Sequence, residues 1–372
     1  MITLKEMTTK KEMKTFVKFP FDLYKNNNYW VPPIIADEVD SFDKNINPVF
    51  KHADARFFVA LKDQKIVGRV AAIVNWTEIN QQLIKKMRFG WFDFIDDLEV
   101  SKALLAKVEE IGKHHKLEFM EGPVGFSNLD KVGVLTEGFD QLGTSITWYN
   151  HPYYKEHLEQ LGFTKAKEWI ESYFYMKDVN PENFQRMAKL IKQRYEVHII
   201  NFTSTKQLLP YVKPMFELFN TTYAKLASFV PISDIEIEYF KNKYIHLIDP
   251  EFIKYVADKD GKLLAFAITM PSFSEALQKA KGKLYPFGIF HLLNAKKNSK
   301  ESVFYLIGIH PDYQNKGLTA ILFDEYFKVS TKRGITKLIR TPELEENNAI
   351  HALWKNFNPI IHKRRRTYRK DF

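Results

Sequence analysis

The chain contains no cysteine, and this absence excludes several kinds of chemistry at once. Without thiols the protein can form no disulfide, hold no metal through thiolate ligands and use no cysteine nucleophile. Nothing else in its composition calls for an oxidising compartment. Histidines do not replace the missing ligands, because no two of them are spaced for one helix face at i and i+4. We therefore expect no metal site.

Long apolar runs are missing as well. No window approaches the run of about 18 apolar residues that a membrane-spanning helix needs, and residues 1–14 contain no apolar stretch of the signal-peptide kind. We expect a cytoplasmic protein without a membrane span. With 372 residues, 45% of them hydrophobic, the chain is long enough for two domains with buried cores.

Positive charge is in excess, with a net charge of +10 and a pI near 9.2. The densest basic run is at the C-terminus, in the sequence HKRRRTYRKDF of residues 362–372. This pattern favours a terminal strand whose alternate residues face water, and anion binding is the alternative. The run lies in no recognisable nucleic-acid-binding module, so we expect no nucleic-acid partner.

The two halves of the chain repeat one layout. Apolar, β-branched runs around a tight turn predict a hairpin at residues 56–74 and another at 252–270. Each hairpin is followed by an insertion, a strand, a helix, a further strand and helix, and a closing strand. This repetition indicates duplication of one domain. We predict an α/β (α+β) protein with two tandem domains, 1–178 and 179–372, each a mixed sheet flanked by helices. The apolar insertion 272–297 should pack on another part of the protein.

One strand, loop and helix in the second half form a plausible anion site. An apolar strand at 303–309 ends before Pro311, and the loop that follows contains Gly317 and leads into an amphipathic helix. A glycine-containing turn at a helix N-terminus presents free backbone N–H groups and the positive end of the helix dipole. A diphosphate fits such a site, but one glycine in a strand-turn-helix also occurs in many α/β folds.

The same segment resembles the GNAT superfamily of acetyl-CoA-dependent N-acetyltransferases. Gln314 and Gly317 match the superfamily's Gln/Arg-x-x-Gly-x-Gly/Ala loop, and Thr319 stands where Gly or Ala is usual. The resemblance implies that an acyl-CoA, acetyl-CoA in the first instance, is the co-substrate. Its pyrophosphate would lie on the amides of the loop, and its acyl carbonyl beside the preceding strand. The implied loop residues are Gln314, Asn315, Lys316, Gly317, Leu318 and Thr319, and the implied strand residues are Gly308, Ile309 and His310.

A second motif of the superfamily, Asn-x-x-Ala-x-x-Leu-Tyr, resembles the helix that begins at Asn347. The resemblance places Asn347 and Trp354 beside the coenzyme. Trp354 replaces a tyrosine that protonates the departing thiolate in many members, and an indole N–H is no acid at neutral pH. Tyr305 or Tyr313 could supply the proton instead, or solvent could.

A general base is suggested by the carboxylates that follow the strand at 337–341. Many GNAT enzymes place a base near this point, and Glu343 is the closest to the strand end. A helix dipole explains a glutamate at a helix start equally well.

The first half lacks a glycine loop and has Asp96 and Asp97 at the corresponding helix start, where carboxylates would repel a diphosphate. We interpret it as a degenerate GNAT domain. Its sequences EGFD at 137–140 and YNHPYY at 149–154 resemble uncharacterised bacterial tandem-GNAT proteins.

Three functions remain open on this basis. The first is transfer of an acyl group from acyl-CoA to an amine on a small molecule or peptide. The second is aminoacyl transfer from charged tRNA, which the loop disfavours because tRNA-using members tend to lack it. The third is a binding or scaffold role without chemistry, which Trp354 favours.

Overall fold

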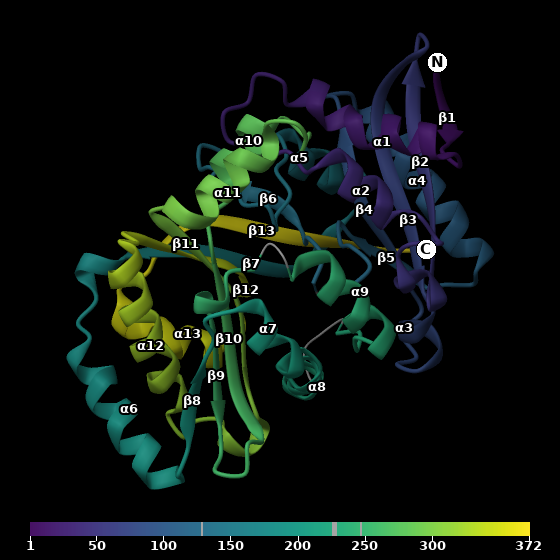
Figure 1. Ribbon diagram of the computed structural model, residues 1–372. Coiled ribbons are helices and arrows are strands. Elements are labelled where there is room, and N and C mark those ends of the chain that lie inside the picture. Colours follow the sequence, from purple (N-terminus) through teal and green to yellow (C-terminus); the bar gives the residue numbers. More distant parts are fainter. Residues whose placement is uncertain (128, 225–228, 246–247) are drawn as a thin grey trace.

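The computed structural model describes residues 1–127, 129–224, 229–245 and 248–372. Within these residues, thirteen strands form one continuous mixed sheet with helices on both faces (Figure 1). This confirms the α/β (α+β) class. The strands are β1 (Ile2–Glu6), β2 (Ala53–Lys62), β3 (Lys65–Asn75), β4 (Lys86–Phe94), β5 (Phe119–Gly122), β6 (Val134–Glu137), β7 (Thr164–Tyr175), β8 (His198–Asn201), β9 (Ile253–Ala257), β10 (Leu263–Pro271), β11 (Glu301–Ile309), β12 (Lys337–Leu344) and β13 (Ile360–Asp371).

The helices pack against the sheet in two layers. They are α1 (Lys10–Leu23), α2 (Ile35–Ser41), α3 (Trp76–Asn80), α4 (Leu98–His114), α5 (Tyr153–Gln160), α6 (Glu182–Tyr195), α7 (Thr205–Leu208), α8 (Val212–Tyr223), α9 (Asp234–Tyr244), α10 (Ser274–Ala280), α11 (Gly288–Asn298), α12 (Leu318–Arg333) and α13 (Asn348–Trp354). Neighbouring residues of one strand enter different layers, because side chains alternate across a sheet. In β2, for example, Phe57 packs under α1 and Phe58 packs under α4.

The order of the strands repeats between the halves. It runs β1-β2-β3-β4-β5-β13-β7-β12-β11-β10-β9-β8, with β6 paired to β13 off this path. Counted from either outer edge, five strands in chain order come first. The last strand of the other half follows, and then the last strand of the same half. This confirms the predicted tandem repeat. The division at 178/179 stays a prediction, because the sheet is continuous across it.

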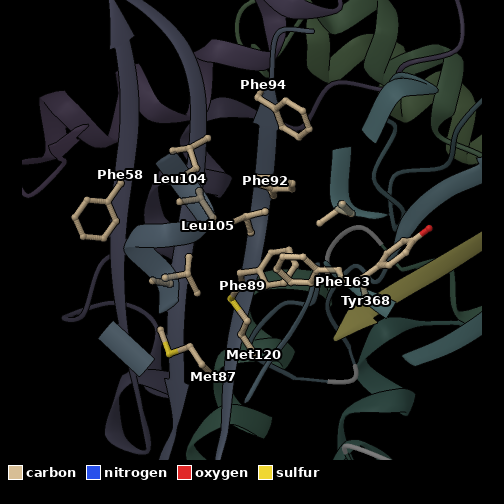
Figure 2. Close-up of a cluster of buried hydrophobic side chains, with 14 of the residues drawn as sticks. Phe58, Met87, Phe89, Phe92, Phe94, Leu104, Leu105, Met120, Phe163 and Tyr368 are labelled. Carbon is tan, nitrogen blue, oxygen red and sulfur yellow. The ribbon is translucent and has the colours of Figure 1, made fainter. Parts of the chain in front are cut away.

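The exchanged strands contribute to each other's cores. Tyr368 of β13 is fully buried among Phe89, Met120 and Phe163 of the first half (Figure 2). Phe174 of β7 lies in turn in the core of the second half, with its ring 4.9 Å from that of Phe357. Each half therefore completes its hydrophobic core with a strand from the other.

The basic C-terminal run forms the strand that we predicted, with alternate residues partly exposed at Arg364 and Arg366, but the basic residues that alternate with them are buried. β13 lies in the middle of the sheet, and Lys363 and Arg365 are each 1% exposed. Both pair with the buried carboxylate of Glu171 on β7, which compensates their charge. Arg366 pairs with Glu168 at 2.8 Å. The run therefore joins the halves, and its charges are partnered within the protein.

Two connecting segments bear on the site described below. Helix α6 packs in the core of the second half, where Ile191 contacts the start of α12. The insertion between β10 and β11 forms α10 and α11. It packs on the first half as expected, with Leu277 and Leu292 against Val31 and Ile34.

Candidate functional site

Strands β11 and β12 separate partway along their length. They pair in parallel only from Glu301/Lys337 to Phe304/Arg340, whereas β11 continues beside β10 as far as Ile309. The second part of β11 therefore has backbone groups facing a gap on the β12 side. Strands β4 and β5 of the first half separate in the same way after Arg88/Glu121.

The side of β11 that faces this gap follows from one backbone hydrogen bond. The His310 N–H donates to the Leu264 carbonyl of β10 at 2.8 Å. The backbone N–H and C=O groups of a strand alternate in direction, so those of Gly308 face β10 and those of Ile307 and Ile309 face the gap. The Ile307 carbonyl accepts a 2.9 Å hydrogen bond from the hydroxyl of Tyr223 on α8. The Ile309 carbonyl likewise accepts 3.4 Å hydrogen bonds from Thr222 and Gln314. Within the described residues, the backbone groups that remain for a ligand in the gap are therefore the N–H groups of Ile307 and Ile309.

Glycine at position 308 has a packing reason. A Cβ at this position would come within 2.2 Å of the Phe266 ring. The side chain of His310 stabilises the loop that follows the strand, because its Nδ1 accepts a 3.3 Å hydrogen bond from the Asp312 N–H. Of the three strand residues predicted to flank the acyl group, Ile309 is the one whose backbone faces the gap.

The loop after β11 delivers the chain to an uncapped helix. Gly317 is the N-cap of α12 with φ at +83°, and no side chain caps the helix. Asn315 is also left-handed, with φ at +60°. Glycine is favoured at position 317 by this backbone conformation and by Ile191, which would lie 3.1 Å from a Cβ. Among the described residues, no side chain accepts a hydrogen bond from the N–H groups of the first turn of α12.

The other predicted loop residues differ in exposure. Gln314, Asn315 and Lys316 are exposed, Thr319 is partly buried and Leu318 is fully buried in the core. The Gln314 amide donates to the Ile309 carbonyl at 3.4 Å, and the Lys316 ammonium lies 4.9 Å from the Tyr313 ring. The backbone N–H groups of Gln314 and Lys316 donate within the loop, to the carbonyls of Pro311 and Tyr313 at 3.3 Å each. The exposed part of the loop thus presents one lysine at the positive end of α12.

The corresponding helix of the first half begins differently. Asp97 is the N-cap of α4, and its side chain accepts a 3.1 Å hydrogen bond from the Glu99 N–H. The same carboxylate pairs with Lys62 at 2.8 Å, and the adjacent Asp96 contacts His157 at 3.0 Å. The start of α4 is thus occupied by the protein's own carboxylates.

Glu343 lies at the centre of a buried polar cluster beyond the point where the strands separate. A β-bulge between Arg340 and Glu343 interrupts the pairing with β7. Arg340 donates through Nε at 3.3 Å and forms a second, shorter hydrogen bond to Glu343. The Trp354 indole donates to Glu343 at 3.0 Å, and His351 Nδ1 lies 3.7 Å away. Burial raises the pKa of Glu343, although these three neighbours each lower it.

Trp354 is a core residue that positions this carboxylate. It is 1% exposed and its ring packs 4.8 Å from that of Phe304. Asn347 caps α13, because its side-chain oxygen accepts a 3.2 Å hydrogen bond from the Ile350 N–H. Among the side-chain hydrogen bonds of the described residues, those of Asn347 and Trp354 are internal to the protein.

Two buried tyrosines, Tyr305 on β11 and Tyr223 on α8, belong to elements that border the gap. Burial raises the pKa of Tyr305 to about 12, so its hydroxyl stays protonated at neutral pH. Burial also raises the pKa of Tyr223, and the negative charge of Glu343 adds to this effect. Tyr313 lies in the loop after β11, with its ring 6.2 Å from that of Tyr195.

Sequence reasoning missed Tyr223, Arg340 and His351. Arg340 and His351 stand three positions before and eight positions after Glu343, and a search for buried ion partners at these spacings could have suggested them. Tyr223 is more than 80 residues away from Ile307, so no local pattern indicates it. No group of three or more metal-binding side chains occurs in the described part of the chain.

The segment that contains these strands and helices matches a known protein family. Residues 213–358 match the model of the acetyltransferase (GNAT) family. This part of the chain is similar to a GNAT domain. The match includes the separated strands, the uncapped helix and Glu343. A GNAT domain implies an acyl-CoA co-substrate in general, and the uncapped start of α12 and the open edge of β11 fit such a group.

Similarity to other proteins extends over nearly the whole chain. Protein YghO of Escherichia coli is 26% identical over 97% of this chain and 93% of its own length. A bacterial ceramide synthase of Caulobacter vibrioides is 24% identical over 97% of this chain and 95% of its own length. A tandem GNAT protein from the clavulanic acid biosynthesis pathway covers the full chain and 98% of its own, with a TM-score of 0.58 and 9% identity. The chain thus has a tandem GNAT fold.

Proposed function

We propose that the protein is an acyl-CoA-dependent N-acyltransferase whose coenzyme is held by the second half, residues 179–372. The single observation that supports this most is the difference between two equivalent helix starts. The start of α4 is closed by Asp97, whereas the start of α12 has no capping side chain and lies in the matched GNAT region. An anionic diphosphate is attracted to the second and repelled from the first. Residues 1–178 then form a degenerate copy without coenzyme.

In this proposal the loop and strand hold the coenzyme, with acetyl-CoA as the simplest donor. The N–H groups of Asn315, Gly317, Leu318 and Thr319 would bind the diphosphate, because those of Gln314 and Lys316 donate within the loop. The backbone of Ile309 would face the acyl arm. When bound, acyl-CoA supplies a thioester whose acyl group an amine can take, with release of the coenzyme thiol. Asn347 and Trp354 support the wall beside it.

Glu343 would accept the proton that the amine loses. A base is most effective when its pKa lies near the working pH, and burial moves the pKa of Glu343 in that direction. Arg340 and Trp354 hold the carboxylate in one orientation. Tyr305 keeps its proton at neutral pH and is our candidate for donating one to the leaving thiolate.

The acceptor is an amine, and one relative suggests its kind. The relative from Caulobacter vibrioides is named a ceramide synthase, and a ceramide is the amide of a long-chain amine and a fatty acid. We propose that the acceptor here is likewise the amino group of a lipid, and that the donor includes acyl-CoAs longer than acetyl-CoA.

The test is release of coenzyme thiol from acetyl-CoA and palmitoyl-CoA in the presence of sphingoid and short-chain amines, with mass spectrometry of the amide. The protein has no cysteine, so a thiol reagent reports on the coenzyme alone. Glu343→Gln should lower the rate by about 10²–10⁴-fold and keep coenzyme binding. Glu346→Gln, which changes an exposed carboxylate paired with Lys167, is the matched control and should leave the rate unchanged.

Two outcomes would contradict the proposal. Equal rates for Glu343→Gln and wild type would exclude Glu343 as the base. Tight coenzyme binding without thiol release for any amine would favour a binding or scaffold protein.

A further inference from the structure

The arm formed by α10, α11 and their connection has one buried side. Gln278 of α10 donates to the Trp30 carbonyl at 3.0 Å, and Leu277 and Leu292 pack against Val31 of the first half. These contacts fix the arm on the protein. They also determine which of its residues face outward.

The outward side of the arm is apolar. Tyr285 and Phe287 are each 72% exposed, Phe290 is 65% exposed and Leu293 is 55% exposed. The last three are spaced by three residues, so Phe290 and Leu293 share one face of α11 and Phe287 lies just before it. Single exposed apolar residues are ordinary, but four large ones within nine positions form a patch that indicates an interaction surface.

Basic residues surround this patch. Residues 274–300 contain six lysines and a single acidic residue, Glu275. Lys281, Lys283 and Lys297 are exposed at the two ends of the patch. Lysine is depleted at protein–protein interfaces, whereas a lysine-flanked aromatic surface suits the headgroup region of an anionic bilayer. The charge of the arm therefore favours a lipid surface over a protein partner.

We propose that the arm docks the protein on anionic membrane surfaces. Tyr285, Phe287, Phe290 and Leu293 enter the boundary between headgroups and acyl chains, and the flanking lysines contact lipid phosphates. None of the described helices is long and apolar enough to cross a membrane. The arm is shown in light green in Figure 1, beside the start of β11. It joins the end of β11 that is opposite to the loop at α12, so docking leaves the coenzyme loop in water.

The test is sedimentation of the full chain with vesicles of phosphatidylglycerol and phosphatidylcholine in equal parts, compared with vesicles of phosphatidylcholine alone. Wild type should bind the anionic vesicles at least about tenfold more tightly. The triple variant Phe287→Glu, Phe290→Glu, Leu293→Glu should lose this binding. Leu190→Glu is the matched control, because Leu190 is 53% exposed on α6, and it should bind as wild type does.

A second variant separates charge from apolar insertion. Lys281→Gln, Lys283→Gln, Lys297→Gln should reduce the preference for phosphatidylglycerol while the protein stays folded. Equal binding of the triple glutamate variant and wild type would overturn the proposal. So would a wild-type dimer that the glutamate variant dissociates and that ignores vesicles, since the patch would then bind a second copy. Thiol release in detergent does not depend on docking, so failure here leaves the proposed reaction in place.

Discussion

The uncapped start of α12 can be tested with one charge. Thr319 is the second residue of the helix and is partly buried, so an aspartate at this position places a carboxylate within the first turn. Thr319→Asn has nearly the same shape as Thr319→Asp and lacks only the charge. Any difference between the two variants therefore measures electrostatics at the proposed diphosphate site.

The two consequences of the charge have opposite signs. A carboxylate in the first turn of a helix stabilises it by about 0.3–1 kcal/mol through the dipole. At about 5 Å from a phosphate charge, the same carboxylate raises the free energy of coenzyme binding by about 1–3 kcal/mol, for an effective dielectric between 80 and 20. This corresponds to about 5- to 150-fold weaker binding. Thr319→Asp should thus be the more stable protein and the weaker binder.

Calorimetric titration with acetyl-CoA and coenzyme A measures the binding, and urea denaturation measures the stability. Salt screens exposed charges, and the Debye length falls from about 10 Å at 0.1 M salt to about 3 Å at 1 M salt. The difference in affinity between the two variants should therefore become smaller over this range. Equal affinities of the aspartate and asparagine variants at low salt would refute the assignment of this loop. Weakened binding only after changes at Asp97 would place the coenzyme in the first half instead.

Three further predictions concern the buried polar groups. Trp354→Phe should lower the free energy of unfolding by about 2–3 kcal/mol in urea denaturation, because the Glu343 carboxylate loses a hydrogen bond from a buried donor; an unchanged value would mean that this bond adds nothing. Arg365→Met should lower the free energy of unfolding by about 3–5 kcal/mol in the same assay because it breaks a buried ion pair with Glu171, and an unchanged value would contradict this. Burial lowers the pKa of His362 from 6.5 to about 4, so the unfolded chain binds more protons in that window. The stability of wild type should therefore fall more steeply than that of His362→Gln as pH drops from 6.5 to 4, and parallel curves would contradict the burial argument.

Local sequence patterns predicted elements of the fold correctly. The sequence Lys62-Asp63-Gln64-Lys65 forms a two-residue turn with φ at 51° and 62° for the central residues, the conformation that suits a tight hairpin. The helix predicted to begin at Asn347 is also present, with Asn347 as the N-cap of α13. Alternation, turn residues and caps are local properties, so a single sequence records them.

Contacts between residues that are far apart in the sequence could not be predicted in this way. The run at 362–372 has the composition of an exposed strand, and only its pairing partners bury it. Lys363 and Arg365 can be buried because Glu171 lies opposite to them on β7, about 190 positions earlier in the chain. The same holds for the candidate site. Glu343 was found from its place after a strand, but the hydrogen bond of Tyr223 to Ile307 depends on how α8 packs.

The exchange of β7 and β13 also constrains the time course of folding. Synthesis proceeds from the N-terminus, and domains usually fold as they emerge. Here β5 of the first half pairs with β13, which is synthesised after all the other described strands. Until then the first half lacks Tyr368 from its core, and β5 and β7 lack the strand that lies between them. A nascent chain of residues 1–178 should therefore depend on chaperones for the whole period in which the second half is made.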